Sequence, residues 1–246
     1  MAARSGRLGV GIVGAGHVGP VLGAALAGAG HALTGISAIS ERSRERAETL
    51  LPGVPILPVP QVVERSELVL LAVPADELPG LVDGLAATGG WQAGQLIVHT
   101  AARYGTAVLA PATAAGVIPL AIHPAMSFTG TSLDLTRLAE SWFAVTAPTP
   151  VQPIGQALVV EMGGEPILIA EADRPAYAEA IATVSTFSRS VIEQAARILA
   201  GLGVEAPGRV LGSLARSTVE DALSRAQPDS IDPAVLPPVD DLQEDL

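Results

Sequence analysis

The chain has 246 residues, no cysteine and a formal net charge of −11, and all fourteen of its basic residues are arginine. The missing cysteine and lysine exclude disulfides, cysteine-ligated metals and any mechanism that needs a lysine, while the negative charge argues against binding to nucleic acid. No apolar run approaches the ~20 residues that a membrane helix requires, so we expect a cytoplasmic protein without a membrane partner.

A glycine-rich turn lies close to the N-terminus. An apolar strand is expected over residues 8–13, and a helix of small residues follows the turn to about Gly30. The turn between them consists of Gly14, Ala15, Gly16, His17, Val18 and Gly19. In this setting the GxGxxG pattern provides a tight turn, close approach of a diphosphate to the backbone, and close packing of the helix on the strand. It predicts a dinucleotide-binding loop, with a purely structural glycine turn as the alternative.

The second strand, expected over 32–40, and the helix after it carry residues that indicate which dinucleotide binds. A site for NAD places Asp or Glu at the end of this strand, where the carboxylate binds the ribose 2′-hydroxyl. This sequence instead offers hydroxyl and guanidinium groups at Ser37, Ser40, Arg42, Ser43 and Arg44. Such donors suit a 2′-phosphate, so NADP(H) is the predicted cofactor, and Ser40 is the expected N-cap of the helix. Two alternatives stay open: the arginines, Arg46 included, form a solvated helix face, or Glu41 binds the ribose.

Further apolar strands alternate with helical segments. Strands are expected over 54–59, 67–74, 95–101, 117–124, 142–147 and 166–170. Helices are expected over 77–88, 105–116 and 154–164. Such alternation is typical of a parallel sheet covered on both faces. The predicted fold class is therefore α/β, a Rossmann-type, mostly parallel sheet with helices on both faces, followed by a smaller all-α C-terminal domain.

The C-terminal domain is expected to consist of helices over 173–199 and 206–226. The predicted division is a Rossmann-like domain at 1–170, a helical substrate and dimerisation domain at 171–227, and an acidic, disordered tail at 228–246. Apolar residues recur at helical spacing along the first helix, at Ile181, Val184, Val191 and Ile198. This stripe predicts a homodimer in which the helix packs against its mate.

Candidate catalytic residues follow the strands, because ligands of open α/β sheets bind beyond the carboxyl ends of the strands. Val73 and Pro74 are expected to form the wall beside the nicotinamide of the cofactor. His99 and Thr100 end one strand, and His123 ends the next. A neutral imidazole there can polarise a carbonyl group or relay a proton. The alternative is that each histidine has a structural role, bonded to the backbone.

The other two histidines, His17 and His31, are interpreted as structural. Two strand-end histidines without a nearby acid make a poor metal site, so we predict no metal.

With these residues identified, the chain resembles a bacterial family that pairs an N-terminal Rossmann-like domain with a C-terminal helical domain of unknown function. That helical domain is related to the C-terminal domain of 6-phosphogluconate dehydrogenase. The resemblance covers about residues 7–225, through segments such as "RLGVGIVGAGHVG", "LVLLAVPADEL" and "IPLAIHPAMSFTGTSLDL". It implies an NADP-dependent oxidoreductase that dimerises through the helical domain.

The chain departs from this family at the expected substrate wall. Where the family reads His-Thr-Ser-Gly, this chain continues from Thr100 with Ala101 and Ala102. On the helix facing the cleft, the family's His and Asn are replaced, while one serine is retained. The residues at those helix positions are Thr183, Ser185, Thr186 and Phe187. Ser185 and Thr186 remain candidates for the substrate wall, although the substitutions also favour a protein that binds NADP(H) without catalysis.

The leading hypothesis is an NADP(H)-dependent oxidoreductase that transfers a hydride to or from a small carbonyl or imine compound, with His123 as the first catalytic candidate. The alternative is a non-catalytic NADP(H)-binding sensor or scaffold. "HPAM" is also similar to the His-Pro-Met turn of prephenate dehydrogenases, with the arginines for two substrate carboxylates sought among Arg103, Arg137 and Arg189. Ketopantoate reductase, which shares the fold, is disfavoured because its lysine proton donor has no counterpart.

Overall fold

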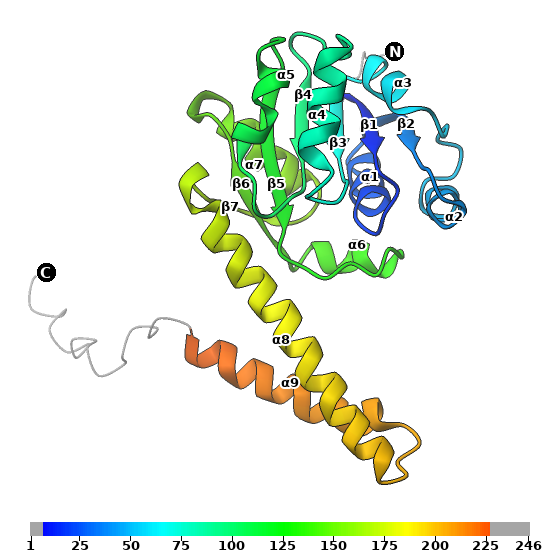
Figure 1. The fold of residues 1–246 in the computed structure, drawn as a ribbon, viewed down its shortest axis with the longest axis vertical. Helices are drawn as coiled ribbons and strands as arrows, with labels where there is room; N and C mark the ends of the chain where they lie inside the picture. Colours follow the sequence, from blue (N-terminus) through cyan, green and yellow to red (C-terminus); the bar gives the residue numbers. More distant parts are fainter. Residues whose placement is uncertain (1–6, 227–246) are drawn as a thin grey trace, which may run out of the picture. The chain divides into compact units, whose positions relative to one another are not determined.

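The computed structural model describes residues 7–226 and divides into two compact units, with the boundary between Thr183 and Val184. Within the described residues, the first unit contains a seven-stranded sheet in the order β2-β1-β3-β4-β5-β6-β7 (Figure 1). The strands are β1 (Gly9–Val13), β2 (Ala32–Ser37), β3 (Leu68–Leu71), β4 (Leu96–His99), β5 (Ile118–Pro124), β6 (Trp142–Thr146) and β7 (Glu165–Leu168). The first five are parallel, whereas β6 runs antiparallel to β5 and parallel to β7.

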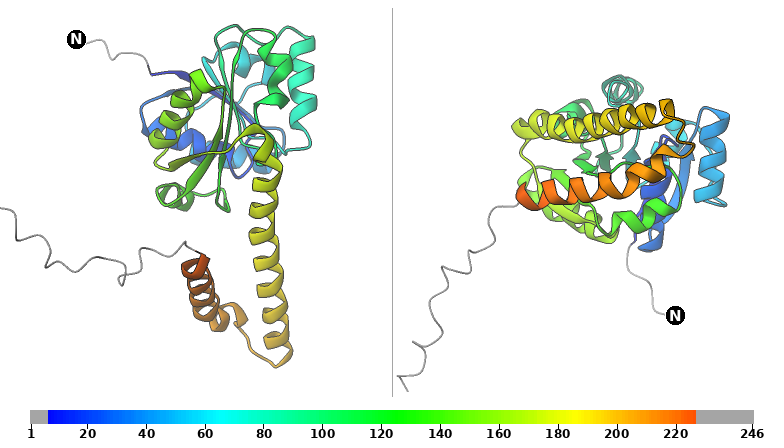
Figure 2. Two further views of the ribbon diagram at one scale, coloured as in Figure 1. Left: turned by 90° about the vertical axis from the view of Figure 1, so that its left-hand side faces the viewer. Right: turned by 90° about the horizontal axis from the view of Figure 1, so that it is seen from below.

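Helices connect these strands and cover both faces of the sheet (Figure 2). The α-helices of the first unit are α1 (Gly19–Gly28), α2 (Glu41–Leu50), α3 (Val59–Glu64), α4 (Leu78–Ala87), α5 (Ala110–Thr113), α6 (Leu133–Leu138) and α7 (Gln152–Glu161). Three short 3₁₀ helices are η1 (Thr106–Leu109), η2 (Thr149–Val151) and η3 (Glu171–Asp173). The architecture confirms the predicted α/β class.

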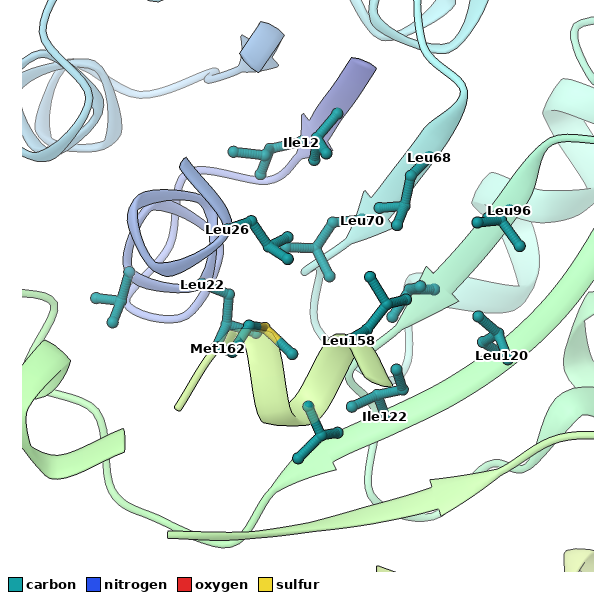
Figure 3. Close-up of a cluster of buried hydrophobic side chains, with 14 of the residues drawn as sticks. Ile12, Leu22, Leu26, Leu68, Leu70, Leu96, Leu120, Ile122, Leu158 and Met162 are labelled. Carbon is teal, nitrogen blue, oxygen red and sulfur yellow. The ribbon is translucent and has the colours of Figure 1, made fainter. Parts of the chain in front are cut away.

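Two apolar clusters hold these layers together, because alternate residues of each strand point to opposite faces. On one face, Ile12, Leu70 and Leu120 of the strands meet Leu22 of α1 and Leu158 of α7 (Figure 3). All five side chains are buried.

The second cluster covers the opposite face. There Val69 and Ile97 pack with Val62 of α3, Val82 of α4 and Leu109 of η1. The sheet is thus buried on both faces, which explains why its strands read as continuous apolar runs.

The structure corrects two predicted elements, and proline accounts for both. The strand expected over 54–59 is reduced to a single bridge between Ile36 and Ile56, because the prolines of "VPILPVP" have no N–H for a strand ladder, and α3 begins there instead. The helix expected over 105–116 is split into η1 and α5 by Pro111, which cannot donate to the preceding turn. The short helix α6 was not predicted.

Helices make up the second unit. Helix α8 (Arg174–Gly201) begins in the first unit and continues into the second, which also contains α9 (Pro207–Ala226). Within α8 only Arg174 is buried, and no residue of α9 is. Neither α8 nor any other helix between residues 7 and 226 combines the length and hydrophobicity that a bilayer crossing requires. The tail predicted at 228–246 lies outside the described residues.

Candidate functional site

A cleft of about 350 Å³ lies at the carboxyl ends of β1 and β3. The strands that follow β1 along the chain are on opposite sides of it, β2 on one side and β3 on the other. This is the topological switch point at which open α/β sheets bind ligands. The cleft is lined by Val13, Gly14, Ala15, Gly16, Ser37, Ile39, Ser40, Ser43, Val59, Ala72, Val73, Pro74, Glu77 and Leu81.

The three glycines of the turn have different surroundings. Gly14 has φ +105°, and a side chain there would collide with the Ala72 carbonyl group. Gly19 packs so closely under β1 that a Cβ atom would overlap the Gly14 oxygen, whereas nothing lies within 4 Å of the corresponding position at Gly16. The first glycine therefore permits the turn and the third permits close helix–strand packing. The second leaves space at the mouth of the cleft for a close ligand.

Serine hydroxyls form one wall of the cleft. Ser37 Oγ, at the end of β2, accepts a hydrogen bond from Gly14 N–H at 3.1 Å. Ser40 Oγ accepts from Ser43 N–H at 3.2 Å and caps α2 as predicted, and Ser43 Oγ donates to the Ser40 carbonyl at 2.7 Å. The hydroxyls are therefore held in fixed places, and no carboxylate stands at the end of β2.

Some predicted cofactor residues are not among those lining the cleft. Arg42 and Arg44 lie on α2 with exposed side chains, and within residues 7–226 neither makes an ion pair or a side-chain hydrogen bond. His17, Val18 and Gly19 continue the turn into α1, beyond the cleft lining.

His99 is fully buried and bonded to the backbone on both sides of its ring. Nδ1 accepts a hydrogen bond from Ala101 N–H at 3.2 Å, and Nε2 lies 2.8 Å from the Gly105 oxygen, to which it donates. Burial lowers the His99 pKa to about 4, and the Arg174 charge adds to the effect. With both ring nitrogens bonded to the backbone, the geometry favours the structural alternative for His99.

His123 differs from His99, because its ring contacts a side chain. Its Nδ1 atom lies 2.8 Å from the Tyr177 hydroxyl, and the two rings meet edge to face. Burial, then the charge of Arg174 and the proximity of His99, lower the His123 pKa to about 4, so the imidazole is neutral at pH 7. Burial also raises the Tyr177 pKa, an effect that Arg174 opposes.

Arg174 is the largest fully buried side chain in the described part of the protein, at 0% exposure. Its Nε donates to Thr146 Oγ1 at 2.7 Å, and its Nη2 donates to the carbonyl oxygens of Ala121 at 2.8 Å and Ala144 at 3.1 Å. Its guanidinium lies 5.8 Å from the centre of the Tyr177 ring. Burial lowers its pKa to about 10, so Arg174 remains a cation at pH 7.

Sequence reasoning missed both Arg174 and Tyr177. Their one signal is the segment "EADRPAY", which belongs to the family resemblance but has no motif with a defined chemistry. Their partners Thr146 and His123 are 28 and 54 residues away in the sequence, a pairing that only the fold reveals.

The remaining candidates are dispersed. Thr100 is half-buried, and its N–H bonds the Leu71 carbonyl. Ser185 and Thr186 lie on α8 within the second unit, and their place in a substrate wall stays a prediction. Of the arginines considered for substrate carboxylates, Arg103 pairs with Asp76 and Arg137 with Asp134, while Arg189 is exposed in the second unit. No group of three potential metal ligands lies together within residues 7–226.

Comparison with known proteins identifies both parts of the chain. Residues 2–124 match the family model of a Rossmann-like domain, and residues 141–231 match a domain of unknown function, DUF2520. No curated protein matches the sequence.

Solved structures share the fold at low sequence identity. BF3122 from Bacteroides fragilis, provisionally assigned as an NADP oxidoreductase, is 18% identical with a TM-score of 0.72, over 90% of this chain and 84% of that one. A 1-pyrroline-5-carboxylate reductase from Streptococcus pyogenes is 21% identical with a TM-score of 0.66, over 94% and 86%. An imine reductase from Pseudomonas sp. is 13% identical with a TM-score of 0.66, over 90% and 76%.

Proposed function

The chain belongs to the Rossmann-like domain family and continues into a DUF2520 domain, and on that premise we propose that it is an NADP(H)-dependent oxidoreductase. Its substrate is a small carbonyl or imine compound. The observation that carries this proposal is the contact of His123 with Tyr177. Because β1, β3, β4 and β5 are parallel, the end of β5 and the glycine turn after β1 lie at the same edge of the sheet.

The cleft suits the adenosine end of a dinucleotide. Its glycine turn leaves space above Gly16, and no side chain caps the N-terminus of α1. Backbone N–H groups at such a terminus attract a diphosphate. Apolar side chains such as Ile39 and Leu81 also line the cleft, and they can hold an adenine ring by apolar contact.

The preference for NADP(H) over NAD(H) is supported by the end of β2. Ser37, Ser40 and Ser43 line the cleft there. The hydroxyls of Ser37 and Ser40 act only as acceptors in their hydrogen bonds within the described chain, so their O–H groups can donate to a phosphate without the repulsion that a carboxylate would cause. Arg42 and Arg44 are exposed on the same helix, without partners in the described part of the chain, and supply positive charge beside these hydroxyls.

A bound nicotinamide supplies or accepts the hydride, which leaves the protein to handle one proton. In the tautomer that accepts the Tyr177 O–H at Nδ1, His123 carries its own proton on Nε2. A proton that passes from Nε2 to the substrate oxygen or nitrogen is replaced at Nδ1 by the Tyr177 proton. Solvent then supplies a proton to Nε2, and the Nδ1 proton returns to the Tyr177 phenolate, which restores the starting tautomer. The nearby Arg174 cation stabilises the phenolate during this exchange.

The homodimer is part of the proposal, and the exposed surface of the second unit supports it. Phe187 and Leu214 are 65% and 64% exposed, and both line an apolar groove between α8 and α9. Two helices cannot bury their apolar faces alone, and continuous exposed apolar surface usually marks an interface. A second copy offers the same complementary face.

Titration with NADPH and NADH, followed by cofactor fluorescence, tests the proposal first. We expect tight binding of NADPH, weaker binding of NADH, and turnover with members of a panel of small ketones, aldehydes and cyclic imines. NADPH binding without turnover across the panel would favour the sensor or scaffold alternative. No binding of either cofactor would refute the proposal.

A further inference from the structure

Arg46 is hydrogen-bonded to the glycine turn, although one alternative from the sequence placed it with Arg42 and Arg44 on a solvated helix face. Its Nη1 atom donates to the Ala15 carbonyl oxygen at 3.0 Å, and its side chain is half-buried. Its neighbours on α2, Arg42 and Arg44, are exposed. Among residues 7–226, no carboxylate pairs with Arg46, so its charge beside the loop is not neutralised within the described chain.

Gly130 packs against the side chains of both Arg46 and His17. It is buried with φ +74°, and a Cβ atom there would lie 2.7 Å from His17 Cδ2 and 2.8 Å from Arg46 Nε. The segment after β5 therefore touches both the glycine turn and Arg46, at a point where a Cβ atom would displace the side chain of His17 or Arg46. Its continuation, α6, packs against α1, the helix that starts from the turn (Figure 1).

Asp134 fixes the position of Gly130. This carboxylate is fully buried and accepts hydrogen bonds from Gly130 N–H at 2.8 Å and from Thr129 N–H at 2.7 Å. Thr129 Oγ1 donates to its second oxygen at 2.9 Å. Gly130 therefore lies in a loop that is rigidly held against the turn.

We propose that Arg46 binds the bridging diphosphate of the dinucleotide and that Gly130 is the positioning residue that keeps the guanidinium beside the loop. A diphosphate on this fold rests on the turn that Ala15 belongs to. The Ala15 carbonyl takes one of the five N–H donors of Arg46, and the remaining fork suits phosphate oxygens. The inference rests on the proposed function only in requiring that a dinucleotide binds.

Two ligands separate this role from recognition of the 2′-phosphate. NADPH carries both the bridging diphosphate and the 2′-phosphate, whereas adenosine 2′-monophosphate carries the 2′-phosphate alone. By calorimetry we expect Arg46→Gln to weaken NADPH binding about tenfold, the order of one charge-assisted contact, and to leave adenosine 2′-monophosphate unchanged. The double variant Arg42→Gln with Arg44→Gln should weaken the binding of both NADPH and adenosine 2′-monophosphate.

The glycine has a matched control. Gly53 shares the left-handed conformation, with φ +82°, but has open space where a Cβ atom would lie. We expect Gly130→Ala to weaken NADPH binding and Gly53→Ala to leave it unchanged. If Gly130 acts through Arg46, the double variant Gly130→Ala with Arg46→Gln binds no more weakly than Arg46→Gln alone.

Each contrary outcome has a distinct meaning. Equal loss of both ligands in Arg46→Gln, or no loss of either, overturns this inference while the proposed function stands. Additive losses in the double variant overturn the positioning role of Gly130. If Gly130→Ala fails to fold, Arg46→Gln alone still decides the binding role. A wild-type chain that binds no NADPH overturns both the inference and the proposed function.

Discussion

His123 Nδ1 and the Tyr177 hydroxyl lie 2.8 Å apart, and their rings meet at 79° with centroids 5.5 Å from each other. The pair joins the C-terminal end of β5 to the first turn of α8. It is the one contact between a predicted catalytic histidine and another side chain capable of proton transfer in the described structure.

Removal of either member of this pair should reduce turnover without loss of the cofactor. We expect His123→Ala to abolish measurable turnover and Tyr177→Phe to lower kcat about 100-fold, within the usual range for a lost acid–base group. Affinity for NADPH should stay near that of the wild type. Tyr104→Phe, which removes a hydroxyl bonded only to Arg103 in the described chain, is the matched control and should keep full turnover.

Steady-state kinetics with cofactor titration checks this prediction. Parallel loss of turnover and NADPH affinity in His123→Ala would indicate a structural histidine. Full activity of Tyr177→Phe would remove Tyr177 from the proton path.

Mild acid should destabilise the protein through His99. Its pKa is about 4 in the folded state, because burial disfavours the charged ring, against about 6.5 in the unfolded chain. Between these values the unfolded state binds more protons, so stability is fully present above pH 6.5 and falls as the pH is lowered toward 4. The loss attributable to His99 is about 3 kcal/mol.

Urea denaturation at pH 7 and at pH 4.5, for the wild type and His99→Gln, measures this contribution. We expect the variant to be less stable at pH 7 and to lose less stability on acidification. Parallel pH dependences for the two proteins would show that His99 does not titrate as described.

Replacement of Arg174 should be strongly destabilising. Arg174→Met leaves the Ala121 and Ala144 carbonyl oxygens and Thr146 without their donor, at a cost of about 3 kcal/mol or more. Arg103→Met is the exposed counterpart and should change the free energy of unfolding by less than ~1 kcal/mol. Urea denaturation gives both values.

The same variant provides a second measurement. Because the Arg174 charge helps to lower the His123 pKa, that pKa should rise in Arg174→Met if the variant folds. Titration of the imidazole by NMR detects the shift, and an unchanged His123 pKa would contradict the assigned electrostatic contact.

A charge in the apolar groove of the second unit should separate the homodimer. We expect the wild type to be a dimer by light scattering at micromolar concentration and Leu214→Glu to be a monomer, because a buried carboxylate at the interface is costly. Glu220→Gln, an exposed change on the same helix, should remain dimeric. A monomeric wild type would refute the dimer.

The sequence predicts those elements that depend on residues close together in the chain. The glycine turn, the Ser40 cap and all but one of the apolar strands depend on neighbouring residues, and they appear where the sequence predicts them. The strand expected over 54–59 does not form, for an equally local reason. Its apolar residues suit a strand, but its prolines have no N–H groups to donate to a neighbouring strand.

The chemistry of the site depends on contacts between distant segments. His99 and His123 both follow apolar strands, and nothing near them in the sequence reveals that one ring is enclosed by backbone while the other meets Tyr177. Arg46 likewise differs from Arg42 and Arg44 only in where α2 directs it. Such distinctions come from tertiary packing, which a single sequence does not encode in a readable pattern.

The hydrogen bonds from Arg174 to β5 and β6 set a minimum length for a first unit that folds on its own. A shortened chain that ends at Ala170, where the strand pattern stops, would lack the guanidinium that joins β5 to β6 and would expose its acceptors. The opening turns of α8 therefore belong to the folding of the sheet, and any dissection of this protein into separable parts must cut beyond Tyr177.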